Sequence, residues 1–239
     1  MAVVIGTAGW SIPAREAAHF PPAGSALQRY SARFAGVEIN SSFHRPHRDS
    51  TWRRWAESVP DGFRFAVKLP RSITHQRKLV DCSDLTAPFL EQVAALGDRL
   101  AVLLVQLPPS LAFDPNSAAR FLEALAGAAA ARIVCEPRHP SWFEDEADAL
   151  LDRLGVARAA ADPAVVPAAA FPGGHRSLAY WRLHGSPAIY RSSYDEARLS
   201  AYAELVGMEL RRRRDVWCMF DNTASSAATA NALELMERI

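Results

Sequence analysis

The chain has 239 residues, of which 49% are hydrophobic and 22% charged, and its formal net charge is +1. This composition is typical of a globular protein. No apolar run approaches the roughly 20 residues that a membrane span requires, so we expect no membrane partner.

Positive charge is concentrated in residues 41–80. This segment has nine Lys or Arg against three Asp or Glu, hence +6, and the rest of the chain has 18 against 23, hence −5. A basic segment on a mildly acidic protein indicates an anionic partner, but an ordinary solvated face gives the same pattern.

The beginning of the chain and its cysteines favour a cytoplasmic protein. The first residues, MAVVIGTAGW, lack the basic region and the long apolar stretch of a signal peptide. Cys82, Cys135 and Cys218 lack metal-type CxxC spacing, and the last two lie in apolar runs typical of core thiols.

Eight short apolar runs predict β-strands. Runs such as LAVLLVQL are apolar almost throughout, which is typical of parallel strands covered on both faces. In chain order the predicted strands are Val3–Gly6, Val37–Asn40, Arg64–Leu69, Ala101–Leu107, Arg132–Glu136, Ala157–Ala161, Tyr180–His184 and Val216–Asp221.

Helical periodicity occurs between most of these strands. Asp114 followed by Pro115 is a typical helix start. The segment DPAVVPAAAFPGGHRS is rich in Pro, Ala and Gly, so we expect the sixth helix to be short or missing. The predicted helices are Leu27–Phe34, Ser50–Ser58, Leu85–Leu96, Asn116–Ala130, Glu144–Leu154, Asp195–Arg213 and Ala224–Ile239.

Eight strands alternating with helices predict an α/β fold, a (β/α)8 TIM-type barrel, as one domain of residues 1–239. No internal repeat or interdomain linker interrupts the pattern. An open doubly wound sheet is the alternative, but no GxGxxG follows a strand.

Polar residues stand at the end of every predicted strand. In such a barrel the strand ends meet at one mouth, where catalytic residues lie. The basic loop of His44, Arg45, His47 and Arg48 belongs to the same rim. The strand-end residues are Thr7, Trp10, Glu38, Asn40, Lys68, Gln106, Glu136, Arg138, His139, Asp162, Arg182, His184, Asp221 and Asn222.

A mouth with this many arginines favours phosphate, carboxylate or a nucleic-acid backbone. Carboxylates beneath it are candidates for acid–base catalysis, or they hold the basic groups in place. Lys68 is either a reactive amine or a further anion contact. The predicted catalytic residues are Glu38, Lys68, Glu136, His184 and Asp221. The predicted ligand-binding residues are Trp10, Asn40, Arg138, His139, Trp142, Arg182 and Asn222.

Seven ordered motifs, over nearly the whole chain, resemble the YecE-like family, a domain of unknown function. They are GTAGWSIP, VEINSSFHR, RFAVKLPRSITH, VQLPPSL, CEPRHPSW, YWRLHG and FDNTASSAATANALEL. The resemblance implies a TIM-type barrel and supplies no reaction. The family usually has an aromatic residue such as Tyr at the position of His44, which disfavours His44 as a catalyst.

Metal binding is an alternative for the carboxylates and histidines at the strand ends. No HxH or HExxH spacing occurs and each candidate histidine has an arginine nearby, so we expect neither a metal nor a cofactor. The sequence favours an enzyme acting on a small anionic metabolite. The alternative is a nucleic-acid-binding protein or a metal-dependent phosphodiesterase of the endonuclease type. Whether the chain catalyses a reaction, and its oligomeric state, stay open.

Overall fold

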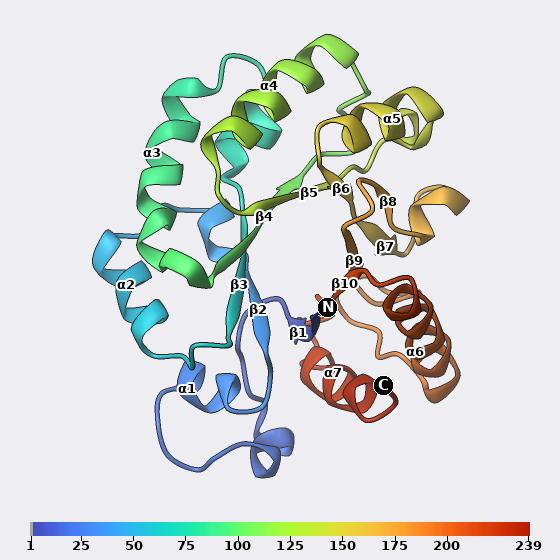
Figure 1. Ribbon diagram of the computed structural model, residues 1–239. Coiled ribbons are helices and arrows are strands. Elements are labelled where there is room, and N and C mark those ends of the chain that lie inside the picture. Colours follow the sequence, from blue (N-terminus) through green and yellow to red (C-terminus); the bar gives the residue numbers. More distant parts are fainter. Residues whose placement is uncertain (1) are drawn as a thin grey trace.

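Parallel strands surrounded by helices form the fold, as the alternating sequence pattern predicts (Figure 1). The computed structural model describes residues 2–239. The strands are β1 Val3–Thr7, β2 Gly36–Ile39, β3 Arg64–Lys68, β4 Leu100–Gln106, β5 Arg132–Glu136, β6 Ala157–Arg158, β7 Ala160–Asp162, β8 Gly173–Gly174, β9 Leu178–Leu183 and β10 Asp215–Phe220. All eight predicted strands are confirmed, and the short β8, antiparallel to β6, was not predicted.

The strands form two sheets, in the orders β1–β10–β9–β7 and β2–β3–β4–β5–β6–β8. The prediction of a single closed barrel is therefore confirmed only in part. The sixth predicted strand divides at Ala159, because β6 pairs with β5 whereas β7 pairs with β9. At the opposite seam, a single parallel bridge between Ala8 and Glu38 joins the ends of β1 and β2.

Two glycines allow β1 and β2 to approach each other closely. A Cβ atom on Gly6 would lie 2.3 Å from the carbonyl oxygen of Gly36, and one on Gly36 would lie 2.6 Å from Val4 Cγ1. No side chain fits at either position without a shift of the neighbouring atoms.

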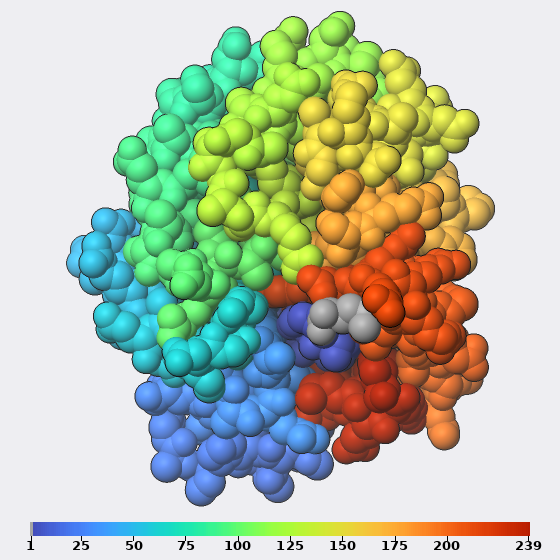
Figure 2. All heavy atoms as spheres, in the orientation of Figure 1, coloured from blue at the N-terminus to red at the C-terminus, as the bar shows by residue number. Residues whose placement is uncertain are grey.

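The two ends of the chain lie side by side. Strand β1 pairs with β10 along its full length, from Val3 opposite Val216 to Thr7 opposite Phe220. In Figure 2 the colours follow one another around the molecule, so that blue amino-terminal segments border red carboxyl-terminal ones.

Helices cover the outer side of the strands (Figure 1). As predicted, Asp114 begins a helix, and its side chain accepts a hydrogen bond from the Ser117 N–H at 2.8 Å. The α-helices are α1 Ala26–Ser31, α2 Asp49–Glu57, α3 Ser83–Val93, α4 Pro115–Ala128, α5 Asp145–Arg153, α6 Glu196–Arg211 and α7 Ala228–Met236. Short 3-10 segments span Ala14–His19, Ser41–Phe43, Ala94–Arg99, Pro140–Phe143 and Pro167–Ala170, and a π-helical turn spans Ser72–Gln76.

The short sixth helix is confirmed. Between β7 and β9, the described chain has one 3-10 turn, Pro167–Ala170, and the two-residue strand β8. Proline at its first position starts the turn, and the repeated Pro and Gly residues prevent a longer helix.

Alternate residues along each strand face either the helices or the interior of the fold. An interior apolar cluster includes Ala66, Val134, Tyr180 and Met219. The residue two positions after each of these faces the same side of its strand. These residues are Lys68, Glu136, Arg182 and Asp221, the last of which directly follows β10. The strand period therefore places these charged side chains together, directly above an apolar layer.

The predicted core thiols Cys135 and Cys218 are confirmed, because both are free and buried, and Cys82 is free and buried as well. Among residues 2–239, no helix has both the length and the apolar character needed to cross a membrane. The predicted single domain of residues 1–239 stays a prediction, and its Met1 lies outside the described residues.

Candidate functional site

Arg182 lies at the centre of a buried ion-pair network at the strand ends. Its guanidinium donates to both Glu38 oxygens, with Nε 2.9 Å from Oε2 and Nη2 2.5 Å from Oε1. Nη1 donates to Glu136 Oε2 at 2.7 Å, and Nη2 also donates to Asp221 Oδ2 at 3.0 Å. Three carboxylates, on β2, on β5 and directly after β10, are thus held by one side chain that is 1% exposed.

His184 connects two of these carboxylates. Its Nδ1 lies 3.0 Å from Asp221 Oδ2, and its Nε2 lies 3.0 Å from Glu136 Oε1. Arg138 closes the network, because its Nη2 donates to Glu136 Oε1 at 2.7 Å and lies 2.7 Å from His184 Nε2. Tyr180 donates its hydroxyl to Glu38 at 2.9 Å.

The network keeps two of its carboxylates, Glu136 and Asp221, ionised. Burial alone would raise the pKa of Glu136, but Arg138 and Arg182 lower it well below its usual value. Burial likewise opposes ionisation of Asp221, but Arg182 and the hydrogen bond with His184 lower its pKa. For Arg182, burial is outweighed by Glu136 and Glu38, which raise its pKa well above the usual value.

A cavity of about 640 Å³ opens above this network. Its charged lining consists of Lys68, Arg71, Arg138 and the carboxylate Asp221, so positive charge is in excess. Burial and Lys68 lower the pKa of His75, which favours its neutral form. The lining residues are Asn40, Phe43, His44, Lys68, Arg71, His75, Gln106, Pro109, Arg138, Tyr190, Asp221 and Thr223.

The structure divides the predicted catalytic residues into two layers. Lys68 and Asp221 line the cavity, whereas Glu38, Glu136 and His184 lie beneath it and are fully buried. His184 contacts Glu136 directly, and Arg182 links Glu136 to Glu38. Their position suits the support of the cavity residues rather than contact with a ligand.

The predicted ligand-binding residues are similarly divided. Asn40 and Arg138 line the cavity, and Arg182 lies in the network below it. The Asn40 Oδ1 atom is buried and has no hydrogen-bond partner within residues 2–239, so it can accept a hydrogen bond from a bound molecule.

Four other predicted ligand-binding residues lie outside the cavity lining. Trp10 packs edge-on against Trp55, with ring centroids 5.1 Å apart. Trp142 is 1% exposed and donates its indole N–H to the Leu111 carbonyl at 3.0 Å.

His139 and Asn222 stabilise the loops around the site. His139 Nδ1 accepts from the Ser141 backbone N–H at 3.3 Å, at the start of the turn that follows β5. Asn222 donates through Nδ2 to the Ser192 carbonyl and to Asn231 Oδ1, both at 2.9 Å, and so ties the loop after β9 to α7.

Tyr180 is the network residue that the sequence prediction missed. It lies fully buried on β9, two residues before Arg182 and therefore on the same side of the strand. Burial and Glu38 raise its pKa well above the usual value, so it stays protonated and donates to Glu38. The signal available in the sequence was this two-residue spacing.

Lys68 differs from Arg138 and Arg182, because it forms no ion pair within the described part of the chain. Its ammonium nitrogen lies 4.0 Å from the centroid of the Phe43 ring. Burial and the positive charge of Arg182 lower its pKa to about 8. At pH 7 Lys68 is therefore mostly charged, but its neutral form is far more accessible than that of an ordinary lysine.

Replacing Lys68 by methionine is expected to stabilise the protein by roughly 1–2 kcal/mol at pH 7, after a discount for partial exposure. Burial disfavours the charged form of Lys68 in the folded state. The resulting loss of folding stability is fully present below pH 8 and disappears as the pH rises towards 10.5. Denaturant unfolding at pH 7 and pH 10 measures this gain. Lys78→Met, the same change at the other lysine of the chain, is the control. Equal effects of the two substitutions on stability at pH 7 would contradict the lowered pKa of Lys68.

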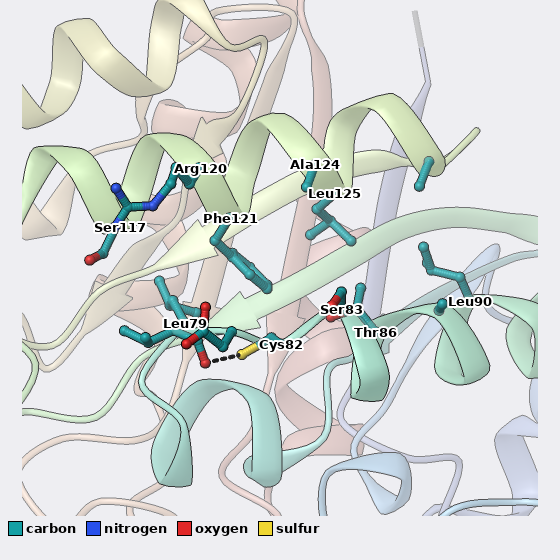
Figure 3. Close-up of a pocket in the computed structure, with 14 residues that line it drawn as sticks. Leu79, Cys82, Ser83, Thr86, Leu90, Ser117, Arg120, Phe121, Ala124 and Leu125 are labelled. Carbon is teal, nitrogen blue, oxygen red and sulfur yellow. Dashed lines mark hydrogen bonds between the residues drawn. The ribbon is translucent and has the colours of Figure 1, made fainter.

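A separate groove of about 350 Å³ lies between α3 and α4 (Figure 3). Phe121 and Leu125 of α4 face Leu79 and Leu90 across it. Its lining comes from these two helices and the loop before α3, not from strand ends. The groove lacks the clustered acid–base groups of the cavity, so we place the candidate site at the strand ends.

The carboxylates that would serve as metal ligands instead surround the Arg182 guanidinium. Among residues 2–239, no group of three or more His, Cys, Asp and Glu side chains has an arrangement that would hold a metal ion.

Comparison with known sequences gives one family and several relatives. Residues 4–239 match the family described as "Protein of unknown function DUF72". UPF0759 protein YecE of Escherichia coli K12 is 33% identical over 153 residues, which are 61% of this chain and 55% of that protein. UPF0759 protein YunF of Bacillus subtilis 168 is 30% identical over 118 residues, 45% of this chain and 40% of that protein. The chain thus spans about half the length of the curated relatives it matches.

Solved structures show the same fold. A DUF72 family protein of Thermotoga maritima MSB8 is 26% identical, with a TM-score of 0.79 over 99% of this chain and 98% of that one. One from Enterococcus faecalis V583 is 18% identical, with a TM-score of 0.82 over 99% and 94%. D-allulose 3-epimerase from Methylomonas sp. is 13% identical, with a TM-score of 0.57 over both full chains, a likeness of fold alone.

Proposed function

The chain belongs to the DUF72 family, as its resemblance to YecE-like proteins predicts, and we propose that it is an acid–base enzyme acting on a small anionic metabolite. The anionic group would be a phosphate or a carboxylate, bound in the cavity above the ion-pair network. We further propose that the two sheets act together as one TIM-type barrel, with this cavity at the carboxyl ends of its strands.

The charge of the cavity lining is the observation that carries this proposal. The arginines of the buried network are neutralised by Glu38, Glu136 and Asp221. Lys68 and Arg71, in contrast, reach the cavity without an ion-pair partner within residues 2–239. An anion placed between them would supply the missing negative charge, and Arg71 suits two-pronged contact with phosphate or carboxylate oxygens.

Lys68 is the residue best suited to transfer protons. Its pKa of about 8 allows it to act as an acid or a base near neutral pH, since an efficient catalyst has a pKa close to the working pH. Asp221 has a lowered pKa and lines the same cavity, so it presents a fixed carboxylate to the ligand. Arg182 and His184 hold that carboxylate in place from below.

The dimensions of the cavity favour a metabolite over a polymer. A volume of about 640 Å³ lies within the range of roughly 300–1,000 Å³ that is usual for small-molecule sites. The exposed arginines Arg53 and Arg54 of α2, which would extend a nucleic-acid surface, lie outside the cavity lining.

Phosphate or sulfate is expected to raise the melting temperature of the wild-type protein more than chloride does at equal ionic strength. At a concentration 100 times its Kd, the anion should raise it by roughly 5–10 °C for a chain of this size. Arg71→Gln should remove most of this gain, because it takes away an unpaired cation of the cavity. Thermal unfolding in matched sulfate and chloride buffers measures both effects.

Arg54→Gln is the matched control, since Arg54 is exposed on α2 and outside the cavity. It should retain the full response to sulfate. Equal melting temperatures of the wild type in sulfate and chloride would disprove the anion site, and so would a full response of Arg71→Gln.

A further inference from the structure

We propose that the cavity continues into a second pocket that holds a planar heteroaromatic group of the same ligand. The ligand class is then a heteroaromatic ring joined to a phosphate or carboxylate. This inference rests on the proposed function, because the anionic group of that ligand occupies the first cavity.

The second pocket has a volume of about 350 Å³ and adjoins the first cavity. Both are lined by Phe43, His44 and Arg71. A ligand whose anionic group is bound by Arg71 therefore lies at the border of the two. The basic loop after β2, whose purpose the sequence left open, forms one wall of this pocket through Arg45 and His47.

The walls of the second pocket are largely apolar and aromatic. Pro46, Trp52, Pro70, Pro88 and Phe89 all line it. Flat apolar side chains match the two faces of a planar ring, whereas the hydroxyl groups of a sugar would lose their hydrogen bonds to water against them.

Polar groups without a hydrogen-bond partner among the described residues border these apolar walls. Trp52 is 1% exposed, and its indole N–H is buried without an acceptor within residues 2–239. The side-chain amides of Gln76 and Gln92, which also line the pocket, form no hydrogen bond with other described residues. A ring with heteroatoms at its edge would replace water at the exposed Gln76 amide and the half-buried Gln92 amide, which an all-carbon ring would not.

The π-helical turn Ser72–Gln76 connects the two pockets. The preceding Arg71 lines both, His75 faces the first cavity and Gln76 the second. The turn is closed by a hydrogen bond from the Arg77 N–H to the Ser72 carbonyl at 2.9 Å. Such wide turns are rare and frequently occur at functional sites, and here one turn brings side chains to both halves of the ligand.

Isothermal titration at fixed ionic strength tests this inference with AMP, CMP, ribose 5-phosphate and inorganic phosphate. We expect at least one nucleotide to bind about tenfold more tightly than ribose 5-phosphate, which carries the phosphate without a ring. Gln92→Leu should abolish that advantage and change the affinity for phosphate less than twofold. Arg54→Gln should change neither.

The outcomes separate this inference from the proposed function. If phosphate binds but neither nucleotide binds more tightly than ribose 5-phosphate, the second pocket is not a ring site and the anion site stands. If phosphate does not bind the wild type, both proposals fail. If a nucleotide keeps its advantage in both Gln92→Leu and Trp52→Phe, its ring lies elsewhere and the inference is overturned.

Discussion

Replacing Arg182 by alanine is expected to lower the free energy of unfolding by roughly 3–5 kcal/mol at pH 7, the usual cost of removing one partner of a buried ion pair. The substitution leaves Glu38, Glu136 and Asp221 without the guanidinium that binds all three. Urea-induced unfolding of the variant and the wild type measures the loss. Arg54→Ala, on the surface of α2, should change stability by no more than about 0.5 kcal/mol.

The cost of Arg182→Ala should decrease as the pH falls. In the wild type, the lowered pKa values of Glu136 and Asp221 contribute stability above their unfolded values, near 4, and this is lost in acid. Without Arg182 the buried carboxyls are better tolerated when protonated, so their pKa values rise and the variant gains stability as the pH falls. A loss below about 1 kcal/mol at pH 7, or one independent of pH, would contradict the role of the network.

Replacing Gly6 by alanine is expected to destabilise the protein by roughly 3 kcal/mol, at the upper end for overpacked sites. The new Cβ would lie 2.3 Å from the Gly36 carbonyl oxygen, and a backbone atom cannot turn aside as a flexible side chain can. The strands β1 and β2 would have to separate at the seam next to the Ala8–Glu38 bridge. Thermal or urea unfolding measures the loss.

Gly127→Ala is the matched control for Gly6→Ala. A Cβ on Gly127 meets nothing within 4 Å, and the residue lies inside α4. Alanine there should be neutral or stabilise by up to about 1 kcal/mol, because it favours the helix. If the two substitutions had the same effect, the close approach of β1 and β2 would be wrong.

Most strands, and the spacing that brings polar residues to one side of them, were predictable because they depend on local patterns. Apolar runs located every strand except the two-residue β8, and the two-residue period of a strand brings Lys68, Glu136 and Arg182 to the inner side together. The pattern also predicted the short sixth helix, since Pro and Gly prevent a longer one whatever surrounds them.

Pairing between distant residues was not predictable. Arg182 and Glu38 are 144 residues apart, and the sequence does not distinguish an arginine that binds carboxylates from one that binds a ligand. The sequence likewise predicts that Trp142 lies at the rim of the cavity and binds a ligand. In the structure its indole N–H instead donates to the Leu111 carbonyl. The sixth predicted strand divides at Ala159 because its two halves pair with different strands, β5 and β9. Which strands lie beside it is set by the whole fold and not by the local sequence.

Titration of Lys68 by NMR, with and without phosphate, tests the anion site most directly. The chain has two lysines, Lys68 and the exposed Lys78, so 13C-lysine labelling gives two sets of side-chain signals that Lys78→Met assigns. We predict a pKa of about 8 for Lys68 in the free protein, and a higher value with phosphate, which favours the charged amine. A Lys68 signal that titrates near the ordinary value of about 10.4, or that phosphate leaves unchanged, would contradict the site.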